Sequence, residues 1–105
     1  MNTEYEETIM GLILNAGNAR SLAIEALRLA RKGLYTESDE KMKECEEAMN
    51  EAHHVQTEMI QAEIRGEETK MTLLAVHAQD HVMNAMTVHD LVREIIENMK
   101  ESKNA

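Results

Sequence analysis

Residues 31–38 read RKGLYTES, and this stretch predicts where one helix ends and the next begins. Gly33 follows a helical pattern that ends on basic side chains, which the C-terminal end of a helix favours. Thr36 and Asp39 then stand three residues apart, like the two members of a capping box, with Asp in place of the usual Glu or Gln. The stretch is therefore expected to be a turn between two helices.

A second glycine divides the remaining chain in the same way. Residues 63–70 read EIRGEETK, in which Gly66 again follows a helical pattern. Glu67, Glu68 and Thr69 then supply the carboxylates and the hydroxyl that the start of a helix favours. The expected helices span residues 3–32, 37–65 and 69–101. Short connections between helices of this length predict an antiparallel, up-down-up three-helix bundle.

The composition indicates an all-α fold in a single domain. The chain has 105 residues, with no proline, tryptophan or phenylalanine and with nine methionines. Ala, Glu, Leu, Met and Lys dominate, and all of them favour helix, whereas β-branched and aromatic residues are scarce. A chain of this length has room for one hydrophobic core. We therefore expect one domain over residues 1–105.

The charge of the chain excludes several classes of protein. The formal net charge of −9 argues against nucleic-acid binding, which needs clustered Lys and Arg. No segment approaches the roughly 20 apolar residues of a membrane span, so we expect no direct membrane insertion. The acidic start MNTEYEETIM lacks the basic and apolar regions of a signal peptide. We expect a soluble, cytoplasmic protein.

The second predicted helix carries reactive residue types that we interpret as structural. Cys45 is the one cysteine of the chain, and its acidic neighbours, among them Glu44 and Glu46, disfavour the thiolate. We interpret it as a packed or half-exposed structural thiol. His53 and His54 are adjacent, so they point about 100° apart and cannot bind one ion together. We interpret them as exposed or structural histidines.

The first predicted helix contains two glycines, Gly11 and Gly17, within an otherwise regular apolar pattern. Each glycine weakens a helix by about 1 kcal/mol relative to alanine. We interpret them as points of close approach by a neighbouring helix. A kink at a binding surface is the alternative.

Residues 73–86 read LLAVHAQDHVMNAM, an apolar pattern interrupted by polar side chains. At about 100° per residue, four polar side chains share one face of the third helix: His77, Asp80, His81 and Asn84. Burying such a group without a partner costs about 1–3 kcal/mol, so the cluster indicates a functional site more than a core. The helix is also apolar on more than one side, which two neighbouring helices cannot cover. We infer that further copies of the chain supply the cover.

Three roles fit this polar cluster. His77 and His81 have the i, i+4 spacing that binds zinc, and Asp80 could add an oxygen ligand. A neutral imidazole nitrogen could instead accept a phosphoryl group. The third role is purely structural, in which the polar patch sets the register of helices at an oligomer axis. The geometry of the helix leaves ligand, nucleophile and structural element open.

Three segments of the chain resemble one family. VHAQDHVMNAM at residues 76–86 resembles the active-site helix of IIA components of lactose/cellobiose-type sugar phosphotransferase systems, which characteristically reads HAQDHLM. GNARSLAIEAL at residues 17–27 and EAHHVQTEMI at residues 51–60 match as well, so the resemblance covers essentially the whole chain. Val82 stands where Leu is usual and Asn84 where Thr is common. Both changes leave the histidines and the aspartate intact.

The resemblance implies a phosphocarrier enzyme. His77 would accept a phosphoryl group from phospho-HPr and pass it to a cysteine of the IIB component. The transported sugar would be a β-glycoside disaccharide of the lactose, cellobiose or chitobiose type. His81, one turn further on, is expected to bind the phosphoryl oxygens or to orient His77. Gln79 points about 160° away from His77, so it could reach the site only from a neighbouring subunit.

The resemblance also implies a homotrimer with a metal ion. Members of the family are trimers of three-helix bundles, with the third helices around the threefold axis. Asp80 would lie at that axis in three copies, and three converging carboxylates must either protonate or find a cation. Oxygen ligands completed by water favour Mg²⁺ over zinc. The competing hypothesis is a non-catalytic, metal-binding helical oligomer that uses His77, Asp80 and His81.

Overall fold

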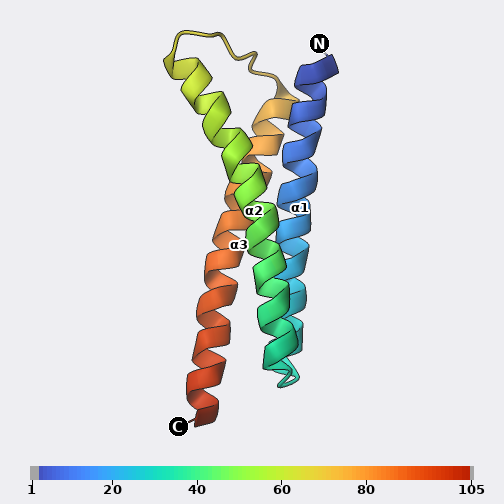
Figure 1. The fold of residues 1–105 in the computed structure, drawn as a ribbon, viewed down its shortest axis with the longest axis vertical. Coiled ribbons are helices and arrows are strands. Elements are labelled where there is room, and N and C mark those ends of the chain that lie inside the picture. The colour runs from blue at the N-terminus through green and yellow to red at the C-terminus, as the bar shows by residue number, and fades with distance from the viewer. Residues whose placement is uncertain (1–2, 105) are drawn as a thin grey trace.

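The computed structural model describes residues 3–104, and within them the chain forms three α-helices and no strand. The helices are α1 (Thr3–Arg31), α2 (Tyr35–Ile64) and α3 (Leu73–Asn104). Figure 1 shows the chain running along α1, returning along α2 and running out again along α3, with the ends of the chain at opposite ends of the molecule. The prediction of an all-α fold is confirmed. Residues 1, 2 and 105 of the expected domain lie outside the described residues.

The core is built mainly from small side chains on α1. Its buried residues recur every three or four positions, as a helix needs to bury one face. They are Ile9, Leu12, Ala16, Ala19, Ala23, Ala26 and Ala30. α1 packs against both α2 and α3 along much of its length, whereas the contact between α2 and α3 is much smaller. None of the described helices is long and apolar enough to cross a membrane.

Glycines end the first two helices, as the sequence predicts. Gly33 has φ 79° and Gly66 has φ 89°, the left-handed conformation that a side chain disfavours. In the connection between α1 and α2, the amide of Gly33 donates to the carbonyl of Ala30 at 2.9 Å, and the amide of Leu34 donates to the carbonyl of Leu29 at 3.0 Å. These bonds satisfy carbonyls that the end of α1 would otherwise leave unpaired.

The expected capping box at the start of α2 is wrong. The helix begins two residues earlier than predicted, at Tyr35, and its N-cap is Leu34, whose side chain makes no capping hydrogen bond. The hydroxyl of Ser38, which is fully buried, instead donates to the carbonyl of Ala26 on α1 at 2.8 Å. Packing of α2 on α1, more than a local cap, therefore fixes where α2 begins.

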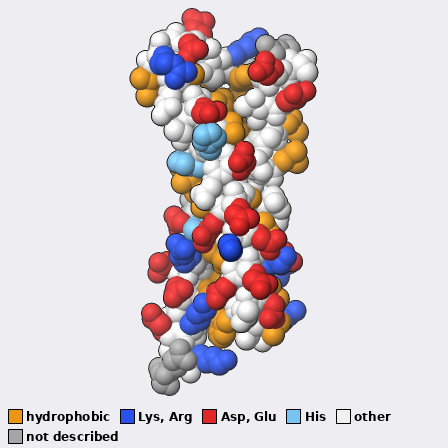
Figure 2. Space-filling model, in the orientation of Figure 1, with side chains coloured by type: hydrophobic (Ala, Val, Ile, Leu, Met, Phe, Trp, Pro, Cys, Tyr) orange, Lys and Arg blue, Asp and Glu red, His pale blue; other side chains and the backbone are white. Residues whose placement is uncertain are grey.

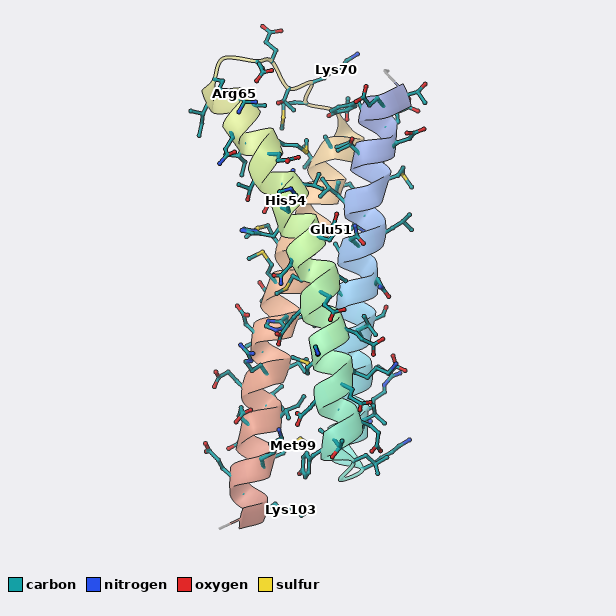
Figure 3. The ribbon with its side chains drawn as sticks, in the orientation of Figure 1. Glu51, His54, Arg65, Lys70, Met99 and Lys103 are labelled. Atoms are coloured by element: carbon teal, nitrogen blue, oxygen red, sulfur yellow. The ribbon has the colours of Figure 1, made fainter. Side chains whose placement is uncertain are left out.

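The predicted start of α3 at residue 69 is also wrong, because the helix begins at Leu73. The hydroxyl of Thr72 accepts a hydrogen bond from the amide of Ala75 at 3.1 Å, which makes Thr72 the N-cap. The carboxylate of Glu67 pairs with Arg65 at 2.8 Å and leaves the start of α3 uncharged. Figure 3 shows Arg65 at the end of α2 and Lys70 in the connecting segment. α3 also extends three residues beyond the expected end at residue 101.

That connecting segment is held against α1, because the hydroxyl of Tyr5 donates to the carbonyl of Lys70. A cavity of about 340 Å³ lies beneath this contact, between α1 and the end of α2. The hydrogen bond ties the segment that precedes Thr72 to the first turn of α1. It therefore helps to set the direction in which α3 starts.

The expected close approach of a helix at Gly11 and Gly17 is wrong within the chain. A Cβ atom added at either position would meet no atom within 4 Å, apart from the backbone of the same helix turn and the flanking residues. Met10 and Leu14, on the same stretch of α1, are 44% and 67% exposed. The two glycines therefore lie on an open part of the surface of the single bundle.

Candidate functional site

The site predicted from the sequence lies on a face of α3 that the other two helices leave uncovered. The buried face of α3 packs against the bundle through seven residues: Ala75, Ala78, Val82, Ala85, His89, Val92 and Ile96. The opposite face carries five large apolar side chains that are 41–87% exposed: Leu73, Val76, Met83, Leu91 and Ile95. We call these five residues the apolar stripe. A single bundle thus leaves apolar surface along the whole length of α3.

Two histidines meet beside this stripe. The Nε2 atoms of His77 and His81 lie 3.1 Å apart, and the two rings meet edge to face with centroids 4.5 Å apart. His77 is exposed and His81 is half-buried. A hydrogen bond between two ring nitrogens needs one donor and one acceptor, so the tautomers of the two rings are coupled. The pair offers an accessible nucleophilic nitrogen together with a neighbouring N–H donor.

Asp80 lies near the centre of the apolar stripe. At about 100° per residue it is only about 20° from the line of Leu73 and Leu91 around the helix. Its side chain is exposed and has no partner within residues 3–104. Asn84, one turn further along, is exposed too. An uncompensated carboxylate in an apolar surface would need a cation or a hydrogen-bond donor if another molecule covered it.

Within the described part of one chain, no three His, Cys, Asp or Glu side chains come together closely enough to hold a metal ion. The side chains of His77, Asp80 and His81 therefore do not form a metal site within one chain, although all three lie on one side of α3. His53 and His54 are both exposed, as expected, and His54 lies 3.2 Å from Glu58 one turn along α2. Figure 3 shows His54 on α2. A metal held by several ligands would therefore require more than one copy of the chain.

Gln79 is turned away from His77 and toward α2. Its Oε1 atom accepts a hydrogen bond from Nε2 of Gln56 at 2.6 Å. The same nitrogen of Gln56 lies 3.9 Å from Sδ of Met83. Gln56 is only 8% exposed, so this contact is a polar link inside the α2–α3 interface. It joins the HAQDH segment of α3 to the HHVQT segment of α2.

Sequence reasoning missed the role of Gln56. The sequence contained an indication that Gln56 is buried. Gln56 follows Cys45 and Ala52 at the spacing of residues that share one buried face of a helix. A glutamine on such a face needs a partner. What the sequence alone does not supply is the rotation of α2 about its axis relative to α3, which decides that the partner is Gln79.

Two other titratable residues lie away from this site. Burial, and to a lesser degree the charge of Glu46, raises the pKa of the Cys45 thiol from 9.0 to about 11, which confirms the interpretation of a packed thiol. His89 lies about 18 Å further along α3 than His77. It is buried, with Nδ1 2.9 Å from Asp90 and Nε2 3.4 Å from Glu46. Neither residue offers an accessible nucleophile.

The charged surface gives no sign of a polyanion site. Figure 2 shows acidic side chains outnumbering Lys and Arg on the face drawn, with the basic side chains dispersed among them. The basic residues also form ion pairs with acidic ones, for example Arg93 with Glu46 at 3.1 Å and Lys100 with Asp39 at 2.9 Å. The site is thus a histidine pair, of which His77 is exposed, and an exposed aspartate in an apolar surface.

Comparison with known proteins assigns this arrangement to a class. Residues 7–100 match the family described as PTS system, Lactose/Cellobiose specific IIA subunit. The lichenan-specific phosphotransferase enzyme IIA component of Bacillus subtilis is 54% identical over 97 residues, which is 92% of this chain and 88% of that protein. The chain therefore belongs to the lactose/cellobiose-specific IIA family of the sugar phosphotransferase system, whose members are phosphotransfer proteins.

Solved structures agree with this assignment. The crystal structure of the PTS cellobiose-specific enzyme IIA from Bacillus anthracis is 52% identical, with a TM-score of 0.93, over 99% of this chain and 95% of that one. The IIA chain in a solution structure of the IIA(Chitobiose)–HPr complex of the Escherichia coli phosphotransferase system is 41% identical, with a TM-score of 0.82. The match spans 97% of this chain and 99% of that one. The chain thus has the fold of these IIA components.

Proposed function

We propose that residues 1–105 form one domain that acts as a phosphocarrier, with His77 as the phosphorylated residue. His77 accepts a phosphoryl group from phospho-HPr and passes it to a cysteine of a IIB component. The IIB and membrane components then use it to phosphorylate a β-glycoside disaccharide on entry. The observation that carries this proposal is the exposed imidazole of His77 paired with His81 on α3. The complex of a related IIA chain with HPr supports the choice of donor.

In this proposal the histidine pair divides the work of phosphoryl transfer. A lone pair on a neutral nitrogen of His77 attacks the phosphorus atom, so that a P–N bond to His77 forms as the bond to the donor breaks. In the second transfer the thiolate of the IIB cysteine attacks, and the electron pair of the P–N bond returns to His77. His81 fixes the tautomer of His77 beforehand and afterwards donates to a phosphoryl oxygen. Transfer of this kind depends mostly on positioning and on charge stabilisation.

We also propose that three copies assemble through the apolar stripe of α3. The stripe runs from Leu73 to Ile95, interrupted by Asp80 and Asn84, and lies opposite the buried face of the helix, so burying it would stabilise an oligomer. Packed around a threefold axis, the three copies of Asp80 would converge. Each carboxylate is exposed and unpaired within the described chain, and together they would supply the oxygen ligands that suit Mg²⁺. Such an ion would offset two of the three charges and hold the subunits in register.

The threefold arrangement would also bring Gln79 to the phosphorylation site. Relative to Asp80, His77 lies about 60° to one side around the helix and Gln79 about 100° to the other. In a cyclic trimer each helix turns one flank to one neighbour and the opposite flank to the other. The His77 flank of one subunit would therefore face the Gln79 flank of the next. The amide of Gln79 could then donate to the phosphoryl oxygens.

Replacing His77 tests the proposed function directly. His77→Ala should accept no phosphoryl group from phospho-HPr, while the protein keeps its fold and its oligomeric state, because the His77 side chain is exposed. Acceptance is measured by intact mass after incubation with phosphoenolpyruvate, enzyme I and HPr. His53→Ala, an exposed histidine on α2, is the matched control and should be phosphorylated like the unmodified protein. Acceptance by His77→Ala would overturn the assignment.

A further inference from the structure

The buried amide of Gln56 has a defined orientation, because of what lies around it. Its nitrogen is 2.6 Å from Oε1 of Gln79 and 3.9 Å from Sδ of Met83. A thioether sulfur can only accept a hydrogen bond, so the end of Gln56 that faces Met83 must be the nitrogen. If Gln56 and Gln79 contacted only each other, either amide could be the donor. The contact with the sulfur makes Gln56 the donor.

This orientation decides that of Gln79. Because Gln56 presents a donor, Gln79 must present its oxygen to α2, and the nitrogen end of its amide is left to face outward. Gln79 is only partly buried, so its nitrogen can reach another molecule. If Gln56 presented an acceptor, the amide of Gln79 would turn over and expose its oxygen instead. An exposed oxygen would repel a phosphoryl group, whereas an exposed N–H would bind it.

We propose that Gln56 is a positioning residue for phosphoryl transfer, which acts by holding Gln79 with its amide N–H groups outward, toward the phosphoryl group on a neighbouring subunit. The inference rests on the proposed function and adds a residue of α2 to it. Gln56 itself touches neither His77 nor the phosphoryl group. Its effect passes through the hydrogen bond from its Nε2 atom to Gln79, and the sulfur of Met83 contacts the same nitrogen.

The first test replaces Gln56 by leucine, which has a similar volume and no polar atoms. Gln79 then loses its fixed partner and its amide can rotate. We expect kcat for phosphoryl transfer from phospho-HPr to fall about tenfold, short of the roughly 10²-fold loss that a displacement of about 1 Å can cause. KM for phospho-HPr should stay unchanged, because docking surfaces are not altered. Gln61→Leu, the same change at an exposed position on α2, is the matched control and should leave both constants unchanged.

The second test keeps a hydrogen bond between residues 56 and 79 but exchanges its donor and acceptor. In Gln56→Glu the side chain keeps its shape, and at pH 8 its carboxylate can only accept, so Gln79 must donate to it and expose its oxygen. We expect a larger loss of kcat than in Gln56→Leu, although the link between α2 and α3 is retained. A role of Gln56 in stability alone predicts the opposite order, because the variant that keeps the hydrogen bond would then be the more active one.

A double variant separates this inference from the proposed function. In a Gln79→Ala background, Gln56→Leu should lower kcat no further, since the group that Gln56 positions is already gone. Additive losses, or an unchanged kcat in Gln56→Leu, would overturn the inference and leave the phosphocarrier function in place. If the unmodified protein takes no phosphoryl group from phospho-HPr, the function fails and the inference fails with it.

Discussion

Among single residues, accessibility distinguishes His77, the proposed nucleophile, from Cys45, whose thiol belongs to the more reactive residue type. Cys45 has no exposed surface, and burial raises the pKa of its thiol to about 11, so it is neither accessible nor ionised at neutral pH. His77 is exposed on α3, and its Nε2 atom lies 3.1 Å from that of His81. A phosphoryl donor can approach His77 without any rearrangement of the bundle. The environment of each residue, more than its intrinsic reactivity, assigns its role.

The raised pKa of Cys45 predicts a loss of stability at high pH. The folded protein holds the thiol proton more tightly than the unfolded chain does, because the pKa is about 11 in the fold against an ordinary value of 9.0. The stabilisation is therefore fully present below pH 9 and is lost as the pH rises from 9 to 11. Between pH 8 and pH 10 the free energy of unfolding should fall by about 1 kcal/mol from this group alone.

Urea unfolding of the unmodified protein and of Cys45→Ala measures this contribution. All other ionisable groups are common to both proteins, so the difference between the two free energies of unfolding isolates Cys45. Both proteins are compared at the same concentration, because assembly also contributes to stability. The advantage of the unmodified protein should shrink between pH 8 and pH 10. A constant difference across this range would show that burial does not hold the thiol neutral.

Residue-level features could be predicted from the sequence where one helix determines them. The shared face of His77, Asp80 and His81 follows from the 3.6-residue period of a helix. The unreactive character of the Cys45 thiol follows from its position on the apolar face of its helix and from its acidic neighbours. The contact between Gln56 and Gln79 could not be predicted, because it depends on how two helices are rotated against each other. That rotation is set by packing across the whole interface.

At the level of elements, the ends of α1 and α2 are more predictable than the starts of α2 and α3. Both of these ends depend on a glycine with positive φ, and few other residues can adopt that conformation. The starts had competing candidates, since Thr69 and Thr72 both lie before α3, and Thr36 and Ser38 both lie near the start of α2. Which hydroxyl acts is decided by tertiary contacts, such as that of Tyr5 on α1 with Lys70 in the segment before α3.

Thr72 is predicted to hold the first turn of α3. In Thr72→Ala the amide of Ala75 loses its acceptor, so the first turn should fray and the free energy of unfolding should fall by about 1 kcal/mol. Thr69→Ala is the matched control, because the same change three residues earlier lies outside the helix and should cost much less. Chemical denaturation and amide hydrogen exchange of residues 73–76 measure both effects. Equal losses in the two variants would place the cap elsewhere.

Within the described residues, α3 carries the largest share of the apolar side chains that the bundle leaves exposed. α1 is covered by both neighbours, while α3 exposes the apolar stripe along its length, so the single chain satisfies only part of its apolar surface. The sequence predicted this from the apolar character of α3 on more than one side. The expectation that a neighbouring helix approaches Gly11 and Gly17 closely was wrong, because the period of a helix does not show which of its faces another helix covers.

The trimer proposal predicts that one charge in the stripe will separate the subunits. Leu91 is 59% exposed and near the line of Asp80 around the helix, so Leu91→Lys would bring three ammonium groups together at the axis. The mass in solution, measured by sedimentation, should fall from three chains to one. Met10→Lys, at a 44% exposed position on α1, is the matched control and should remain a trimer.

Asp80→Asn separates the metal from the assembly. Removing the three charges should leave the trimer intact and make its thermal stability insensitive to chelators, whereas the unmodified protein should lose stability when Mg²⁺ is withdrawn. Phosphoryl acceptance by His77 should continue in this variant. A trimeric variant that keeps its response to chelators and loses phosphoryl transfer would show that Asp80 belongs to the transfer site and not to the axis.

The central claim is that His77 carries the phosphoryl group, and the most direct measurement is to locate that group. The protein is incubated with phosphoenolpyruvate, enzyme I and HPr, and its intact mass and modified residue are then determined under conditions that preserve phosphohistidine. The account predicts one acid-labile phosphoryl group per chain, on His77. A protein left unmodified by active, phosphorylated HPr, or a phosphoryl group on any other residue, would contradict it.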